Sequence, residues 1–432
     1  ITCRDWSSDV CSSDLVNAGL PAGSAAGSDG GNGGNGIYIT GAPNVGGGGG
    51  GAGGYGAVVT GAGASGSLSG IVTGGRGGDG GDADTGSGSG GFGSGGSGGS
   101  GGTGLLFTGG GATLTVTGTV RGGDGGAAGA SGPAGNAASA GAGGEGLVGS
   151  DLTIVTSGTV AGGMSGDGVQ AAALHFTGGT NTITFLGTTT GLTGGIIADG
   201  PTLTFDQATN VTVDNVISGL GAVIKAGTGT LTLSGANTYA GGTFVEAGTL
   251  SISADANLGV ASSGIAFTGG TLQVTGTFTT GRLLNLANTG TVDVTAGQIL
   301  TVNGLVMGAG GLEKTGAGTL VLTNSNVYGG GTTISAGTVS VSSDANLGGA
   351  GTTVTLNNST IVGGAGTGAD AVLRTTASFS SSRNIDFSNG GGRIETATGT
   401  TLTLTGSLTT TGSASFIKQG ADGIIDLLLG VK

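Results

Sequence analysis

The chain contains few residues that could carry out catalysis. Its single histidine, His175, lies in the short apolar segment 173–176. A Ser-His-Asp triad would need this histidine as its base, beside a serine on a sharp turn between a strand and a helix. The sequence shows no helix that could provide such a turn. We therefore predict that His175 is a structural residue on a strand and that the chain is not an enzyme.

Two aspartates, Asp206 and Asp214, flank the short apolar segment 211–213. Enzymes that cleave polysaccharides need paired carboxylates, or basic residues, gathered on one face of the fold. No other charged residues cluster around these two. We predict that both are exposed residues at strand ends, so the chain has no catalytic residues.

One glycine-rich segment is similar to a calcium-binding motif. Residues 74–82 read GGRGGDGGD, and the calcium-binding nonapeptide repeat reads GGxGxDxUx, where U is apolar. The U position is Gly81 here, and the motif is not repeated in tandem. Calcium sites of this kind form between successive turns, so isolated copies make poor sites. We predict no metal site and no cofactor.

Lysines and tyrosines recur at equivalent positions of a long repeat, described below. Lys225, Lys314 and Lys418 could form a row of cations for a ligand, but we favour solvated turn residues. Tyr239 and Tyr328 are expected to cap the core rather than stack on sugar rings. Thr-x-Thr pairs begin at Thr113, Thr182, Thr202, Thr230, Thr353 and Thr401. Ice-binding solenoids carry such pairs at the same position of every coil. The intervals here are irregular, so we predict no flat threonine array.

The composition limits the elements that could position these residues. Of 432 residues, 110 are glycine, 4% are aromatic and 8% are charged, with a mean hydropathy of +0.29. Disordered chains combine low hydrophobicity with high charge, and helical domains need more Leu, Glu, Lys and Arg. Both classes are excluded, and the abundant Thr, Ser, Val and Gly favour strands and tight turns. The net charge of −13 weighs against binding to nucleic acid or to an anionic membrane, and we expect no nucleic-acid partner.

Polar and apolar residues alternate in many short segments. In residues 229–234, Leu231 and Leu233 alternate with Thr230 and Thr232, which predicts a strand with leucine inside and threonine outside. Glycine pairs such as 241–242 separate the segments and favour corners.

A repeat of 89 residues organises the second half of the chain. Residues 216–259 align with 305–348 without gaps, and 23 of 44 positions are identical. Tandem repeats of this length favour stacked coils, because one unit cannot bury its inward face alone. We expect an all-β domain at 151–432, a parallel β-helix, or β-solenoid, with units at 216–304, 305–414 and from 415, each full unit holding about four coils.

These repeats resemble the passenger-associated β-strand repeat of autotransporters. The shared motifs are Lys-x-Gly-x-Gly-Thr-Leu from Lys225 and Lys314, Asn-x-Tyr-x-Gly-Gly-Thr from Asn237 and Asn326, and Ala-Gly-Thr-(Leu/Val)-Ser from Ala247 and Ala336. The resemblance implies a right-handed parallel β-helix on the cell surface or outside the cell, whose repeats assist export and folding. It also implies a C-terminal outer-membrane β-barrel partner, which this chain does not contain.

By this resemblance, the expected function is a structural or adhesive scaffold that contacts a host or sister-cell ligand. The alternative is a stalk that presents an enzymatic or binding domain missing from this sequence; a polysaccharide-active β-helix is less favoured.

Residues 16–150 are rich in glycine but contain strand-like segments, such as 71–73 before the turn 74–80. We expect solenoid coils with long glycine-rich loops on one side; the alternative is a disordered stalk. Residues 1–15 hold Cys3, Cys11 and Trp6 and repeat Ser-Ser-Asp twice. They resemble translated sequencing-adapter DNA, so we expect an artefact there and a native signal segment missing from this sequence.

Overall fold

The computed structural model describes residues 25–33, 46–83, 93–133, 135–357, 370–411, 414–419 and 423–427. Residues 1–15, interpreted above as adapter-derived, lie outside this part of the chain. The described residues form two compact units, which are treated separately. Unit 1 runs to residue 204 and adds 214–221, and unit 2 comprises 205–213 and the residues from 222 onward.

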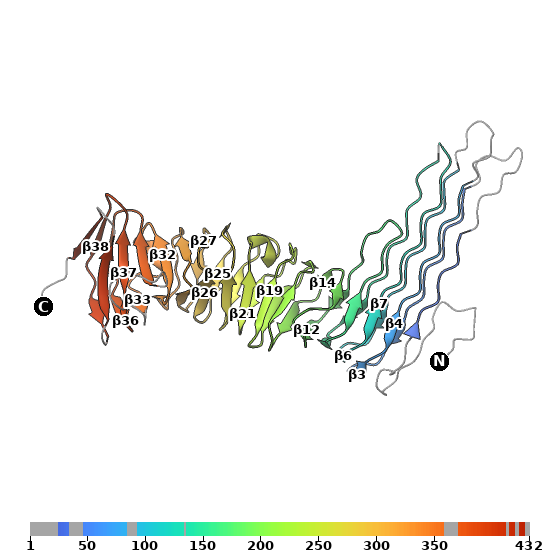
Figure 1. Cartoon of the computed structure of the whole chain (residues 1–432), viewed down its shortest axis with the longest axis horizontal. Coiled ribbons are helices and arrows are strands. Elements are labelled where there is room, and N and C mark those ends of the chain that lie inside the picture. The colour runs from blue at the N-terminus through green and yellow to red at the C-terminus, as the bar shows by residue number, and fades with distance from the viewer. Residues whose placement is uncertain are drawn as a thin grey trace, which may run out of the picture. The chain divides into compact units, whose positions relative to one another are not determined.

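Unit 1 is built from short parallel strands that lie in three sheets (Figure 1). The first sheet holds β1 (Ala25–Ala26), β4 (Ile71–Thr73), β7 (Thr119–Arg121), β10 (Thr159–Ala161) and β13 (Leu192–Thr193). The second holds β2 (Ala57–Val59), β5 (Leu105–Phe107), β8 (Leu147–Ser150), β11 (Leu174–Gly178), β14 (Ile196–Ala198) and β17 (Ile217–Ser218). The third holds β3 (Ser65–Leu68), β6 (Thr113–Val116), β9 (Thr153–Thr156) and β12 (Thr180–Phe185), and β15 (Thr202–Asp206) spans the boundary between the units.

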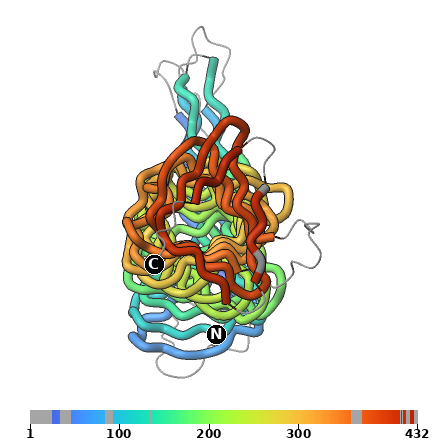
Figure 2. The backbone as a smooth tube through the Cα atoms, turned by 90° about the vertical axis from the view of Figure 1, so that its left-hand side faces the viewer, coloured from blue at the N-terminus to red at the C-terminus, as the bar shows by residue number. Residues whose placement is uncertain are grey.

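Unit 2 has the same parallel pairing, and Figure 2 shows its backbone winding in successive coils. Its first sheet holds β18 (Ala222–Ala226), β20 (Thr243–Val245), β22 (Ile265–Phe267), β25 (Leu284–Leu286) and β28 (Val306–Met307). Its second sheet holds β16 (Val211–Val213), β19 (Thr230–Leu233), β21 (Thr249–Ile252), β23 (Thr271–Val274), β26 (Gly290–Val294), β29 (Leu312–Thr315), β31 (Thr332–Ile334), β33 (Val354–Asn357), β36 (Ile385–Ser388) and β39 (Leu408–Thr410). Its third sheet holds β24 (Phe278–Thr280), β27 (Ile299–Val302), β30 (Thr319–Leu322), β32 (Gly337–Val341), β34 (Ala371–Thr375), β37 (Gly391–Thr396) and β40 (Ser415–Gln419), and a small fourth sheet holds β35 (Phe379–Ser381), β38 (Thr401–Leu404) and β41 (Ile424–Leu427).

This architecture confirms the predicted fold class, an all-β parallel β-helix. The other regular elements of the described residues are two 3₁₀ turns, η1 (Asp255–Leu258) and η2 (Asp344–Leu347). An isolated antiparallel bridge joins Met164 and Gln170 in unit 1.

Alternating side chains form the core of each coil, as the sequence predicts. On the second sheet of unit 2, Leu231 pairs with Val211 on one side and with Leu250 on the other, and its side chain is fully buried. The neighbouring Thr232 points outward and is partly exposed. Burial of each such leucine contributes roughly 1.5 to 3 kcal/mol, so stacked rows of this kind hold the coils together.

Each repeat begins four coils after the previous repeat, and it begins on the next sheet of the coil. From β18 the chain returns to the first sheet at β20, β22, β25 and β28, and it then enters the second sheet at β29. Strand β18, which carries Lys225, is equivalent to β29, which carries Lys314, and to β40, which carries Lys418. These three strands lie in the first, second and third sheets. Equivalent residues of successive repeats therefore lie on different sheets.

The glycine-rich segments of unit 1 form a hydrogen-bonded lattice, visible as extended traces beside β4 and β7 (Figure 1). We call 27–33, 74–81 and 122–129 the outgoing segments, which follow β1, β4 and β7. The returning segments are 46–54, 95–102 and 139–146, which precede β2, β5 and β8. Each outgoing segment donates backbone hydrogen bonds to the following coil, as from Gly74, Gly77 and Gly80 to Arg121, Asp124 and Ala127 (2.8–2.9 Å).

A second set of hydrogen bonds joins the two layers of the lattice. Gly75, Gly78 and Gly81 donate to the carbonyl oxygens of Gly54, Gly51 and Gly48, each at 2.8 Å. Both sets repeat every three residues, the period of polyproline II-type backbone, which has three residues per turn. Two residues of each triplet therefore hold the lattice, and the third faces outward.

Candidate functional site

The repeated lysines are buried, which corrects the expectation that they are solvated turn residues. Lys225 and Lys314 are both 0% exposed. The Nζ of Lys225 donates to the carbonyl oxygens of Ala226 (2.6 Å), Gly227 (2.8 Å) and Ala247 (3.0 Å). An ammonium group has three donors, and all three are used here. The third acceptor lies on the following coil, so the lysine joins two coils.

Lys314 has the equivalent contacts in the next repeat. Its Nζ donates to Thr315, Gly316 and Ala336, at 2.5, 2.7 and 3.2 Å. Burial lowers the pKa of both lysines to about 8. Both stay protonated at neutral pH. Lys418, on β40, is exposed.

Two arginines that the sequence analysis did not single out are also buried in unit 2. Arg282 is 2% exposed, and its guanidinium donates to the Asp255 carboxylate (2.9 Å) and to the carbonyl oxygens of Val260 (2.7 Å) and Gly259 (2.8 Å). Arg383 is 1% exposed and has an equivalent set of acceptors, which begins with the Asp344 carboxylate at 2.9 Å. The segment Asp-Ala-Asn-Leu-Gly, which both repeats share at 255–259 and 344–348, thus supplies the acceptors for a buried arginine.

Polar side chains of this motif also connect coils. The side chain of Asn257 accepts from the backbone N–H of Ala254 (2.9 Å) and donates to Gly235 on the preceding coil (3.0 Å). Tyr239 is 0% exposed, and its hydroxyl lies 2.7 Å from that of Thr243. Tyr328 is also fully buried and has the same contact with Thr332. Both tyrosines are core residues, as predicted, and neither is available to stack on a sugar.

These positions cannot form a ligand-binding row. Lys225 and Lys314 lie on different sheets, and their ammonium groups are enclosed by backbone carbonyls. The repeat motifs are therefore internal connections between coils.

In the glycine-rich lattice, the third residue of each triplet faces outward. In the outgoing segments several of these outward residues are acidic. Several of their carboxylates accept a backbone N–H that takes no part in the two sets of lattice hydrogen bonds. Asp79 Oδ1 accepts from Ala127 N (2.8 Å), Asp82 Oδ1 from Ala130 N (2.7 Å) and Asp124 Oδ1 from Met164 N (2.8 Å). Each bond joins one coil to the next. The aspartates of GGRGGDGGD thus complete the backbone hydrogen bonding of the lattice.

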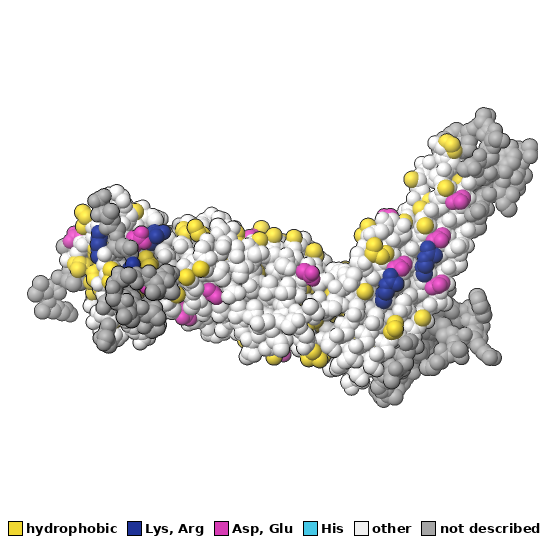
Figure 3. All heavy atoms as spheres, viewed as in Figure 1, with side chains coloured by type: hydrophobic (Ala, Val, Ile, Leu, Met, Phe, Trp, Pro, Cys, Tyr) yellow, Lys and Arg dark blue, Asp and Glu magenta, His cyan; other side chains and the backbone are white. Residues whose placement is uncertain are grey.

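Ion pairs lie along the same face, where Figure 3 shows basic side chains beside acidic ones. Arg76 pairs with Asp79 and Arg121 with Asp124, each at 2.6 Å. The backbone hydrogen bond from Ala127, followed by the Arg76 contact, lowers the pKa of Asp79. Burial raises the pKa of Asp124, but hydrogen bonds from Met164 and Arg121 outweigh it and leave the pKa lowered. In the part of the chain that the structure describes, no group of three or more His, Cys, Asp or Glu residues could hold a metal ion.

His175 lies on β11 with a carboxylate at each ring nitrogen. Its Nδ1 is 2.8 Å from Glu145 Oε1, and its Nε2 is 3.2 Å from Asp199 Oδ2. The hydrogen bond with Glu145 raises the pKa of the imidazole; burial opposes it, and Asp199 adds to it. The structure places no serine nucleophile among these contacts. Asp206 and Asp214 are each exposed.

One column of threonines lines the second sheet of unit 2. Thr230 pairs with Thr249, Thr249 with Thr271 and Thr271 with Thr291. Turns of different length absorb the unequal intervals. Glu313 follows Thr291 and interrupts the row. The neighbouring outward column, Thr232, Ser251, Gln273 and Asp293, holds threonine only at its first position, so no array of Thr-x-Thr pairs forms there.

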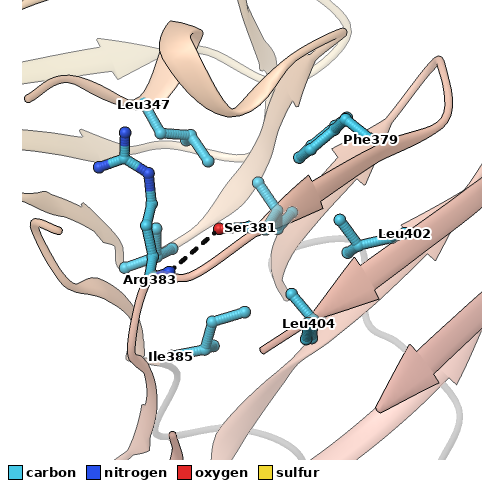
Figure 4. Close-up of a pocket in the computed structure, with 9 residues that line it drawn as sticks. Leu347, Phe379, Ser381, Arg383, Ile385, Leu402 and Leu404 are labelled. Atoms are coloured by element: carbon cyan, nitrogen blue, oxygen red, sulfur yellow. Dashed lines mark hydrogen bonds between the residues drawn. The ribbon is translucent and has the colours of Figure 1, made fainter. Parts of the chain in front are cut away.

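An apolar space lies inside the C-terminal coils of unit 2 (Figure 4). Its lining is mostly aliphatic and aromatic: Leu347, Val354, Leu373, Phe379, Ser381, Arg383, Ile385, Leu402 and Leu404. The Ser381 hydroxyl accepts from the backbone N–H of Arg383 at 3.3 Å. The Arg383 guanidinium is committed to the acceptors described above, so this space belongs to the core.

The comparisons with known proteins place the repeats in a family. The model of the passenger-associated-transport-repeat matches residues 223–252 and 312–341. Residues 223–252 run from β18 to the end of β21, and 312–341 run from β29 to the end of β32. The two segments are therefore similar to passenger-associated transport repeats.

A curated relative, the adhesin BmaC autotransporter of Brucella suis biovar 1 (strain 1330), is 34% identical over 152 residues. The alignment covers 35% of this chain and 4% of the adhesin, so the chain matches a small part of that protein. No solved structure matches the chain significantly. Among the described residues, no helix is long and apolar enough to cross a membrane.

Proposed function

We propose that this chain is part of the exported passenger of an autotransporter and serves as an adhesive β-helical scaffold. The observation that carries the proposal is the pair of passenger-associated transport repeats, each of which spans four strands of the parallel β-helix. The resemblance to an autotransporter adhesin supports the adhesive role.

The role is a non-enzymatic one. Among the described residues, the polar groups that recur in the repeats are directed to coil stacking: the lysines to carbonyls, the arginines to aspartates and the asparagines to the backbone. The adhesin relative agrees with a binding function rather than a catalytic one.

The partner and the location follow from the same family. The whole protein would contain an outer-membrane β-barrel as the partner of this passenger, and the passenger would lie on the cell surface or outside the cell. Its ligand would be a component of a host cell or of a sister cell. The repeat units 216–304, 305–414 and from 415 would then belong to one β-helical domain, 151–432.

Surface display in a laboratory Gram-negative host tests this function. The chain would be placed between a secretory signal and an autotransporter β-barrel, and the barrel alone serves as the control. We expect the chain to be accessible to protease on intact cells, and we expect those cells to attach to host cells or to one another more than the control cells do. Retention in the periplasm would contradict the passenger assignment. Display without added attachment would contradict the adhesive role.

A further inference from the structure

Three consecutive coils of unit 1 meet at the only histidine of the chain. Strands β8, β11 and β14 are neighbours in one sheet, with His175 paired to Val148 on one side and to Ile197 on the other. Glu145 lies just before β8, and Asp199 follows β14. The imidazole therefore lies between carboxylates from the coil before it and the coil after it.

The two contacts differ in what they require of the ring. Ionised carboxylates only accept hydrogen bonds, and a neutral imidazole has a single N–H to donate. The imidazolium form has two, and it can donate to Glu145 at 2.8 Å and to Asp199 at 3.2 Å together. Both contacts are satisfied only when the ring is protonated.

We propose that His175 is a pH-dependent clamp whose protonation ties the coil of β8 to the coil of β14. The groups that face it are Glu145 from the side of β8 and Asp199 from the side of β14. Strand β11 itself, Leu174–Gly178, carries no other ionisable residue. The clamp also reaches the glycine-rich lattice, because the Glu145 carbonyl oxygen accepts the backbone N–H of Gly104 at 2.9 Å.

The direction of the effect follows from linkage. Glu145 and Asp199 raise the pKa of His175 in the folded chain above the 6.5 of an unperturbed histidine. The clamp's contribution to stability is therefore complete below pH 6.5 and is lost as pH rises through the folded pKa. Acidification tightens these three coils, and mild alkalinity loosens them.

Nuclear magnetic resonance titration of the full chain tests the clamp, because a single histidine gives a single set of imidazole resonances. We expect a midpoint above 6.5 that falls in Glu145→Gln and falls further in the Glu145→Gln/Asp199→Asn double variant. The exposed aspartate substitution Asp214→Asn serves as the matched control and should leave the midpoint unchanged. A wild-type midpoint at or below 6.5, or equal midpoints in the wild type and the double variant, would overturn the proposal.

Hydrogen exchange gives a second measurement, which separates a clamp from a merely buried histidine. After correction for intrinsic exchange rates, peptides that cover β8 and β14 should exchange faster at pH 8 than at pH 5.5. In His175→Gln this difference should disappear. An equal difference in His175→Gln would show that another group is responsible.

Discussion

At the scale of single residues, unit 2 buries cations by surrounding them with backbone carbonyls. Buried charges are costly unless they are paired and hydrogen-bonded. Lys314 meets this requirement with three carbonyl oxygens, and Arg282 does so with carbonyls and the Asp255 carboxylate. Each residue bonds to groups on a neighbouring coil, so removal of the side chain would leave acceptors of two coils unsatisfied.

The buried lysines predict a specific pH dependence. Lys225 and Lys314 have pKa values of about 8 in the folded chain, against 10.5 for an unperturbed lysine. Because the unfolded chain binds more protons between these values, the free energy of unfolding should rise from pH 8 toward 10.5. Between pH 7.5 and 9.5 the rise is on the order of 1 to 2 kcal/mol for each lysine. Burial raises the pKa of Tyr239 and Tyr328 to about 12, which opposes the rise above pH 10.

Urea unfolding at pH 7.5 and 9.5 measures this effect. The double variant Lys225→Met/Lys314→Met should show no rise, whatever its stability at pH 7.5. If the free energy of unfolding rose by the same amount in the double variant, the lysines would not be the cause of the rise.

At the scale of elements, two different periods build the two halves of the chain. Period-two alternation forms the strands, with Leu231 inside and Thr232 outside. Period-three triplets form the glycine-rich lattice, where glycine is needed because the layers are in close contact. A Cβ on Gly50 would lie 1.9 Å from the carbonyl oxygen of Gly78, whereas a Cβ on the adjacent Gly49 would meet Ser97 O at an ordinary 3.6 Å.

Two neighbouring substitutions test this lattice. Gly50→Ala should force the layers apart at a cost on the order of 1 to 3 kcal/mol, because the new methyl group overlaps backbone atoms. Gly49→Ala should be neutral or slightly stabilising, because its Cβ faces outward. Limited proteolysis within 46–54 and 74–81 measures the difference, and equal cleavage of the two variants would contradict the outward and inward assignment.

The sequence predicts the strands of this fold better than its polar connections. The alternation of polar and apolar residues, together with the 89-residue repeat, is enough to predict a parallel β-helix, because both patterns reflect the row of buried side chains inside the coils. The lattice was not predicted, because the glycines were considered only as a feature of the composition. The sequence pattern that could have indicated it is the Gly-Gly-x triplet, as in residues 74–82. The burial of Lys314 could not be predicted, since lysine is almost always exposed and its acceptors come together only in the fold. Arg282 was missed for the same reason: its acceptors lie on an earlier coil.

At the scale of the whole molecule, stability comes from contacts between successive coils within each unit. Apolar rows, buried cations and lattice hydrogen bonds all join one coil to its neighbour. In the lattice, the Asp79 and Asp82 carboxylates accept hydrogen bonds from the next coil. These bonds join two successive coils, which is what a bridging ion would do. We therefore expect the described residues to need no metal for this role.

Metal independence is a prediction for the intact chain. Millimolar calcium or EDTA should leave the circular dichroism spectrum and the melting midpoint unchanged. Magnesium at the same concentration serves as the control for general screening of the −13 net charge. A calcium-specific increase of several degrees would restore the nonapeptide interpretation of residues 74–82.

The advance of each repeat by four coils and one sheet has a consequence for how such a chain can lengthen. The strands that carry Lys225, Lys314 and Lys418 lie in three different sheets, so duplication of the 89-residue segment in a gene adds length without building a stripe of identical side chains. Selection on the inward connections can then keep every copy compatible with its neighbours, while the outward residues of each copy diverge independently. The repeat is a unit of construction rather than a unit of recognition.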